Sequence, residues 1–327
     1  MLSIKEKIGY ALGDGAANIA WRGVSTFLFI FYTDVFGLSP AAVGLLFLVA
    51  RFGDGISDVL MGIICDRTNT KHGKFRPWIL WSAIPLGVIL SLLFMSPDFS
   101  PTGKLVYAYT AYIVFTLIYT ANNIPYGALM AVMTGDDKER TSLGSYRMVG
   151  AFVGGMVVQG ALLFLVAYFG NINPTINVSK LDARKYEVSV STNQDIKNVN
   201  IKTKDGIAQF QWVDSRGMSD TPTQGKSFSM DANKEYTFLI SGEENLTSDK
   251  ITIVDQKRGY SNAIYLLSFF LSIFMIITFL TTKERVLPPK NQVTNLGQDL
   301  KDLIRNRPWM VLLGIGVLFS VFNSIKQ

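Results

Sequence analysis

The feature that most constrains this chain is a cluster of ionisable residues inside an apolar stretch that runs from about Pro40 to Cys65. At ~1.5 Å per residue, a helix of that length can cross the hydrocarbon core of a bilayer. Arg51, Asp54 and Asp58 interrupt it at i, i+3 and i+7, which places them on one face of the helix. Each ionisable group near the centre of a membrane helix costs ~2.5–3.5 kcal/mol, so we expect this face to line a polar interior. Two carboxylates one turn apart predict a cation site.

The composition favours a membrane protein over a soluble one. The chain has 327 residues, of which 49% are hydrophobic and 12% aromatic, and its mean hydropathy is +0.26. The single Cys65 excludes a disulfide framework or a cysteine-based metal cluster, and the lone His72 lies in a basic loop, so we expect neither thiol nor histidine catalysis. The net charge of +6 comes from short loops between apolar spans, where it sets orientation, and no nucleic-acid partner is expected.

Apolar periodicity predicts six membrane-spanning helices and the start of a seventh. The loop after the second span is rich in Lys and Arg, so the positive-inside rule predicts that this loop and the N-terminus are cytoplasmic. No cleavable signal peptide is expected, because polar side chains interrupt the first apolar segment. The expected spans are 8–36, 40–65, 78–95, 105–133, 143–169, 260–281 and 309 onward.

Two further polar patterns fall inside the expected spans. In the first span Asp14, Asn18 and Arg22 recur every fourth residue and form a stripe, which either faces the second helix or holds an Asp14–Arg22 structural pair. In the fourth span Pro125 frees a backbone carbonyl and predicts a kink. The polar residues just before the kink fit a substrate wall, or else amides that hydrogen-bond neighbouring helices; they are Tyr119, Asn122 and Asn123.

The segment 171–258 has a different character from the spans on either side of it. It holds twelve Lys/Arg and twelve Asp/Glu residues. Short runs of alternating apolar and polar residues recur, bounded by Gly, Asp, Asn or Ser, and predict six to seven strands of a small antiparallel sandwich. Because five spans precede it, we expect this insertion to be extracytoplasmic.

The expected organisation is therefore an all-α polytopic membrane protein with an inserted extracytoplasmic β-sandwich. Residues 1–170 hold five spans, 171–258 the insertion, 259–282 the sixth span, 283–308 an amphipathic cytoplasmic linker, and 309–327 the start of a seventh span.

Several stretches resemble the glycoside–pentoside–hexuronide:cation symporters, the melibiose-permease branch of the major facilitator superfamily. They are 31–38, 48–58, 73–78, 123–129 and, around the linker, 283–286 and 306–309. The resemblance covers 1–170 and 259–327, and we see none in 171–258. It implies the N-terminal six-helix bundle of a facilitator-type fold, which needs about twelve helices, so a C-terminal half is expected to be missing from this chain.

The resemblance also implies roles for individual residues. It makes Asp54 and Asp58 a cation-binding pair, with Ser57 and Thr120 as further cation ligands. Residues on three spans are expected to contact the substrate, some from the resemblance and some from the patterns above: Asn18, Arg22, Tyr119, Asn122, Asn123 and Arg147. A loop motif between the second and third spans is implied to be a gating element that includes Gly62, Asp66, Arg67, Gly73, Lys74 and Arg76.

The sequence therefore favours a cation-coupled transporter of the inner membrane over an enzyme. The expected substrate is a sugar, glycoside or hexuronide, driven by Na⁺ or H⁺, with Li⁺ admissible, and no cofactor is expected. Two other hypotheses compete with this transporter hypothesis. One is an extracytoplasmic ligand-binding sensor, which leaves the polar membrane interior without a use. The other is a membrane prenyl transferase that holds Mg²⁺ through aspartates, for which a second aspartate-rich helix is missing.

Overall fold

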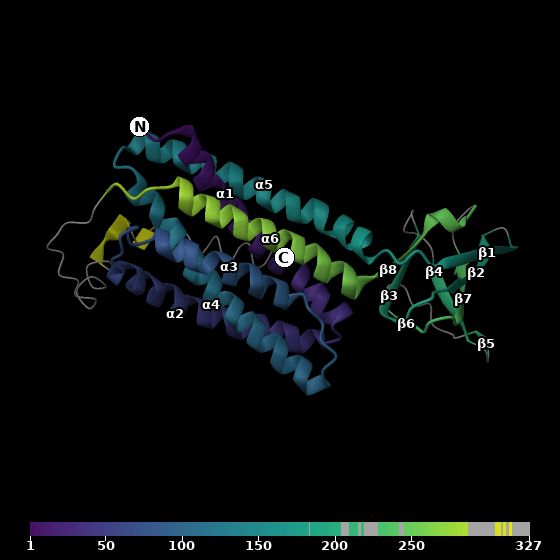
Figure 1. The fold of residues 1–327 in the computed structure, drawn as a ribbon. Helices are drawn as coiled ribbons and strands as arrows, with labels where there is room; N and C mark the ends of the chain where they lie inside the picture. Colours follow the sequence, from purple (N-terminus) through teal and green to yellow (C-terminus); the bar gives the residue numbers. More distant parts are fainter. Residues whose placement is uncertain are drawn as a thin grey trace. The chain divides into compact units, whose positions relative to one another are not determined.

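Six long helices form the helical part of the fold (Figure 1). The computed structural model describes residues 1–182, 184–203, 209–214, 217–218, 228–241 and 245–286, and then 305–308, 310–311 and 314–315. The helices are α1 (Ile4–Gly23), α2 (Pro40–Arg67), α3 (Arg76–Leu93), α4 (Pro101–Met133), α5 (Asp137–Gly170) and α6 (Gln256–Thr281). The first span continues past α1 through two π-helical turns, Val24–Leu28 and Phe31–Val35.

Most of these helices begin at a capping residue close in sequence. Ser39 and Ser100 accept hydrogen bonds from the first turns of α2 and α4, each followed by Pro at the first helical position. Asp136 and Asp255 do the same for α5 and α6, and Ser3 forms a capping box with Glu6 in α1. These caps start α4 at Pro101 and α5 at Asp137, so both helices are longer than the sequence predicted.

The described part of the chain has four helices that are long and apolar enough to cross a membrane: α3, α4, α5 and α6. Large apolar side chains are exposed along α2 and α5, which is the surface expected of helices in lipid. Leu287 to Gln327 forms a separate unit. The predicted linker helix and seventh span lie mostly outside the described residues; within them, Met310 donates a backbone hydrogen bond to Asn306 over 3.0 Å, as in a helix.

Each helix packs against particular neighbours. Helix α1 lies against α5 and α6, α3 lies against α4 and α6, and α2 lies against α4 (Figure 1). The α1–α5 contact depends on glycine. A Cβ atom added at Gly150 would collide with the backbone of Ala11, and one at Gly154 with the backbone of Gly15. Small residues let two backbones approach this closely, as in other membrane helix pairs.

The segment between α5 and α6 forms two antiparallel sheets. One has the strand order β1-β2-β7-β4-β5 and the other β6-β3-β8. Buried side chains from both sheets, among them Val188, Phe238, Val199 and Ile253, join one hydrophobic cluster. The strands are β1 (Thr175–Asp182), β2 (Lys185–Ser191), β3 (Ile196–Thr203), β4 (Gln209–Asp214), β5 (Gly217–Met218), β6 (Phe228–Met230), β7 (Glu235–Ser241) and β8 (Ile251–Asp255).

Strand prediction from alternation found β2, β3, β4, β7 and β8, and it missed β1 and the two shortest strands, β5 and β6. The segment ends earlier than expected, because Asp255 caps α6 and the helix begins at Gln256. That these sheets form a separate extracytoplasmic sandwich remains a prediction.

The glycine contact gives a direct test of α1–α5 packing. We expect Gly154→Ala to lower the free energy of unfolding by ~1–3 kcal/mol, because the added methyl group meets backbone that cannot yield. Gly160→Ala in the same helix is the matched control, since nothing lies within 4 Å of its Cβ position, and it should be neutral or stabilising by up to ~1 kcal/mol. Thermal unfolding in detergent measures both; equal melting temperatures would contradict the packing described here.

Candidate functional site

A polar cavity of about 370 Å³ opens between α2 and α4 beside the end of α1. It contains the charged face of α2 that the sequence singled out, together with an aromatic and amide wall from α4. Its lining residues are Trp21, Arg51, Asp54, Asp58, Thr116, Tyr119, Thr120 and Asn123.

The hydroxyl groups predicted to accompany the two aspartates lie beside them, one bonded to the Asp58 carboxylate and the other to the Asp54 backbone. Thr120, which is buried, donates a hydrogen bond of 2.9 Å to Asp58 Oδ1. The Ser57 hydroxyl donates to the backbone carbonyl of Asp54 over 3.0 Å and lies 3.5 Å from Thr120 Oγ1. The structure therefore brings together all four residues predicted to bind the cation.

Arg51 lines the same cavity but forms no ion pair with either carboxylate. Although it shares a helix face with Asp54, its guanidinium lies 5.5 Å from the centre of the Trp21 ring, a cation–π arrangement. Within the described ranges, no Lys or Arg nitrogen lies within 4.0 Å of a carboxylate oxygen of Asp54 or Asp58. Two like charges one turn apart repel each other, so the pair favours a bound cation or proton.

The residues before Pro125 divide between the cavity and the helix interface. Tyr119 and Asn123 line the cavity, and the Tyr119 ring lies 5.4 Å from that of Trp21. Asn122 is fully buried on the other side of α4, where its amide nitrogen donates to Ser82 of α3 over 2.7 Å. The structure therefore does not bring Asn122 into the cavity; it is one of the amides that hydrogen-bond a neighbouring helix.

The polar stripe of α1 is organised by α5. The Arg147 Nε donates to Asp14 Oδ1 over 3.2 Å, and the Arg147 guanidinium lies 5.5 Å from the centre of the Tyr126 ring. Asn18 donates to the backbone carbonyl of Asp14 over 2.9 Å. The alternative in which Asp14 pairs with Arg22 is wrong: eight helical residues separate them by ~12 Å, whereas the glycine contact between α1 and α5 brings Arg147 within reach.

Arg147, Asn18 and Arg22 are not among the residues that line the polar cavity. Arg22 is exposed, with its stem near Gly155 of α5. Arg147 and Asn18 instead belong to a second polar group around Asp14 between α1 and α5.

The predicted gating residues lie at the end of α2 and in the turn that follows it. Gly62, Asp66 and Arg67 belong to the last turns of α2. Gly73 has a φ of +104° and closes a short turn with Thr70. Lys74 and Arg76 donate their backbone N–H groups to Glu284.

The sequence missed two lining residues and one structural partner. Trp21 lies one turn from Asn18, so the polar stripe could have drawn attention to it, and Thr116 lies one turn before Thr120 on α4. Glu284 gave no signal, because it is more than 200 residues away from the turn that it contacts.

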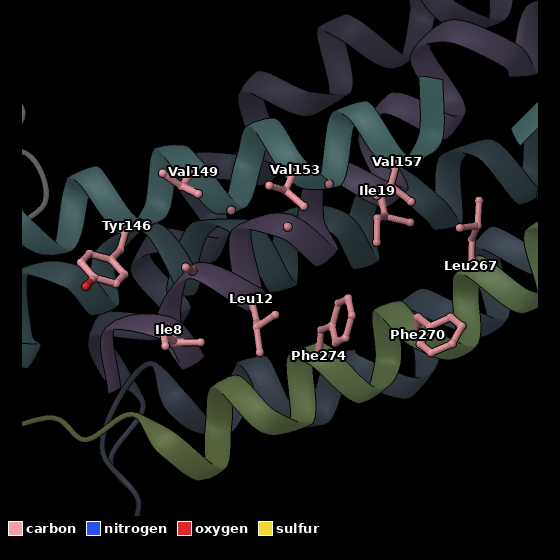
Figure 2. A pocket seen from close by; sticks show the side chains of 14 residues that line it. Ile8, Leu12, Ile19, Tyr146, Val149, Val153, Val157, Leu267, Phe270 and Phe274 are labelled. Atoms are coloured by element: carbon pink, nitrogen blue, oxygen red, sulfur yellow. The ribbon is translucent and has the colours of Figure 1, made fainter. Parts of the chain in front are cut away.

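A second, larger cavity of about 540 Å³ lies between α1, α5 and α6. Figure 2 shows aliphatic and aromatic side chains turned toward it from all three helices, with Tyr146 and Ile8 at one end. It has none of the carboxylates or amides that a cation or a sugar needs. Volume alone therefore does not identify the functional site.

Comparison with known proteins identifies the family of the helical part of the chain. The sequence profile of the family described as MFS/sugar transport protein matches residues 9–192. The match reaches past residue 170 into the first two strands, so the sequence-based limit of the resemblance was too short. The chain belongs to this family and, within it, to the glycoside–pentoside–hexuronide:cation symporters, a class of transporters rather than enzymes.

Individual relatives are similar over about half of the chain. A putative glycoside/cation symporter, YagG, from Escherichia coli (strain K12) is 49% identical over 169 residues, which are 52% of this chain and 37% of that protein. An isoprimeverose transporter from Lactiplantibacillus pentosus is 42% identical over 170 residues, 52% of this chain and 36% of that protein. A glucuronide carrier protein homolog from Escherichia coli is 41% identical over 151 residues, 46% and 33% respectively. The chain thus spans little more than a third of the length of these relatives.

The two neighbouring amides of α4 are expected to respond differently to removal. Asn122→Ala should lower the free energy of unfolding by ~1–3 kcal/mol, because the buried Ser82 hydroxyl loses its donor. Asn123→Ala, at the half-buried cavity wall, should change it by less than ~0.5 kcal/mol. Thermal unfolding of the two variants in one detergent provides the comparison, and a larger loss for Asn123→Ala would reverse the assignment.

Proposed function

We propose that this protein takes part in the cation-coupled symport of a sugar, glycoside or hexuronide across the inner membrane. The observation that carries the proposal is the Asp54/Asp58 pair, placed beside Thr120 and Ser57 in a polar cavity where, among the described residues, neither carboxylate forms an ion pair with Lys or Arg. Membership of a symporter family supports the same activity.

The geometry gives coupling a physical basis. An empty site leaves two carboxylates in a mostly apolar helix, which is unfavourable at membrane depth. A sodium or lithium ion would find oxygen ligands in the carboxylates and in the hydroxyl groups of Thr120 and Ser57, and a proton would neutralise one carboxylate directly. Either ion lowers the repulsion within the site, so substrate binding beside it becomes cation-dependent.

The substrate would lie against the α4 wall of the same cavity. Asn123 can hydrogen-bond hydroxyl groups, and Tyr119 and Trp21 offer aromatic surface. The second polar group, with Arg147 and Asn18, lies on the α1–α5 side and would contact substrate only if the cavity extends there. The names of the relatives, an isoprimeverose transporter and a glucuronide carrier homolog, support a carbohydrate of neutral or acidic type.

Removing either carboxylate charge tests the cation site. We expect Asp54→Asn and Asp58→Asn each to abolish the stimulation of sugar binding by Na⁺ or by acid pH, because one neutral amide ends the repulsion that the cation relieves. Equilibrium binding of labelled glycosides to the protein in reconstituted vesicles, with and without Na⁺, is the measurement.

Asn123→Ala is the reciprocal control for this experiment. It should weaken sugar binding about tenfold, since an unsatisfied buried partner costs ~1–3 kcal/mol, and leave cation binding unchanged. Cation stimulation that persists in both aspartate variants would refute the assignment of the pair.

We also propose a topology in which the N-terminus and the turn between α2 and α3 are cytoplasmic and the strands β1–β8 form an extracytoplasmic β-sandwich. The basic residues of the turn, Arg67, Lys71, Lys74 and Arg76, support the inner assignment under the positive-inside rule. The hydrophobic cluster shared by the two sheets supports a folded unit. Capping of the outer opening or contact with an envelope protein is its proposed role.

Single-cysteine labelling can decide the topology. Cys65 is buried, so the native chain contributes little background. We expect Asn177→Cys in β1 to react with a membrane-impermeant maleimide in right-side-out vesicles, and Lys71→Cys in the α2–α3 turn to react in inverted ones, because both positions are exposed. The opposite pattern would invert the proposed orientation.

A further inference from the structure

Among the six long helices in the described residues, α3 alone lacks a side-chain cap from a residue next to its start. Its first flanking residue, Phe75, has no side chain that can accept a hydrogen bond, and none is formed. The N–H groups at the start of a helix need acceptors, and these groups carry the positive end of the helix dipole.

The missing cap is supplied by Glu284, which lies three residues after the last residue of α6. Glu284 Oε1 accepts the backbone N–H groups of Phe75 at 2.8 Å and Arg76 at 2.9 Å, and Oε2 accepts that of Lys74 at 2.9 Å. One carboxylate thus satisfies three consecutive donors. Charge-assisted hydrogen bonds of this kind are the stronger ones in proteins.

The turn before α3 is shaped to admit this carboxylate. Gly73 has a φ of +104°, which favours glycine. A Cβ atom there would also overlap the Glu284 carboxylate. The neighbouring Arg76 side chain contributes a second link, since it donates to the Phe279 carbonyl of α6 at 2.7 Å and stacks on that ring at 4.7 Å.

The residues that follow Glu284 tie the same segment to two more helices. The backbone N–H groups of Arg285 and Val286 both donate to the Val132 carbonyl of α4, at 2.8 and 2.9 Å. The Arg285 guanidinium pairs with Glu6 of α1 at 2.7 Å. Burial raises the pKa of the Glu6 carboxyl, but hydrogen bonds from Arg285 and Ser3 outweigh it, and the pKa lies below its ordinary value.

We propose that Glu284 is a positioning residue that couples the turn between α2 and α3 to the segment leading out of α6. With Arg285 it makes residues 282–286 a clasp joining the inner ends of α1, α3, α4 and α6. A displacement of this segment must then break the α3 cap and release the turn, and the turn cannot rearrange while the segment is docked. This inference concerns the conformation of the inner loop and does not depend on the cation site.

Hydrogen–deuterium exchange of the full chain in detergent tests the clasp. We expect Glu284→Ala to accelerate exchange of the amides of residues 74–76 at least about tenfold, and Glu284→Gln, which keeps an acceptor but not the charge, to accelerate it less. Lys283→Ala is the matched control, because it changes the adjacent exposed residue and leaves the carboxylate in place. Amides within α4 should not change in any variant, which separates loss of the clasp from general destabilisation.

Arg285→Ala distinguishes coupling from simple capping. Arg285 touches none of the three amides, so faster exchange at residues 74–76 in this variant requires that the whole segment be displaced. Exchange at these amides that stays at the wild-type rate in Arg285→Ala would overturn the coupling. An unchanged rate in both Glu284 variants would overturn the cap as well. If Glu284→Ala does not fold, the Glu284→Gln and Arg285→Ala measurements decide in the same way.

Discussion

The rest of the structure depends on which charged side chains inside the apolar helices form ion pairs. Two groups of carboxylates and guanidinium groups differ in this respect. Asp14 and Arg147, on α1 and α5, bond directly to each other at 3.2 Å. Asp54 and Asp58, on α2, have Arg51 on their own helix, yet the guanidinium lies over Trp21 instead. The first group forms an ion pair, and in the second neither carboxylate forms one with a Lys or Arg of the described residues. Because an unpaired carboxylate at membrane depth is unfavourable, this difference is the physical basis for proposing an exchangeable ion at the second group and a structural role for the first.

The glycine contact between α1 and α5 is what makes the first group possible. Without side chains at Gly150 and Gly154, the two backbones approach closely enough for Arg147 to reach Asp14. The same helix pair leaves the other side of α1 to face α4, where Trp21 joins the polar cavity. The same helix therefore supplies one partner of the paired charges and one residue of the cavity wall.

Helix periodicity was enough to predict the six helices of the described residues and the shared face of the carboxylate pair, because both are local properties of one helix. Four of these helices, α3 to α6, are long and apolar enough to cross a membrane. The face shared by Asp54 and Asp58 follows from spacing alone, and so does its closeness to Ser57. Periodicity could not predict which of Asn122 and Asn123 is buried and which lines the cavity. Adjacent residues differ by about 100° around the helix, and only the position of α3 decides which amide is buried. The prediction for Asp14 failed for the same reason: the stripe identified the polar residues of α1, but not that Asp14 faces α5 rather than the second helix, nor that its partner is Arg147. Residues 287–304, where a linker helix is predicted, lie outside the described residues.

The two kinds of helix cap differ in what they can transmit. A cap such as Ser100 or Asp136 lies next to the helix that it starts, so it stabilises that helix and does not depend on the position of any other helix. Glu284 is separated from Lys74 by 210 residues, and its cap exists only while α6 delivers the chain to the right place. The beginning of α3 therefore depends on the segment that follows α6. Because Gly73 has no side chain, the turn leaves room for this long-range contact. A basic turn held by one distant carboxylate is released only when a discrete set of hydrogen bonds breaks, which is the physical requirement for a conformational switch.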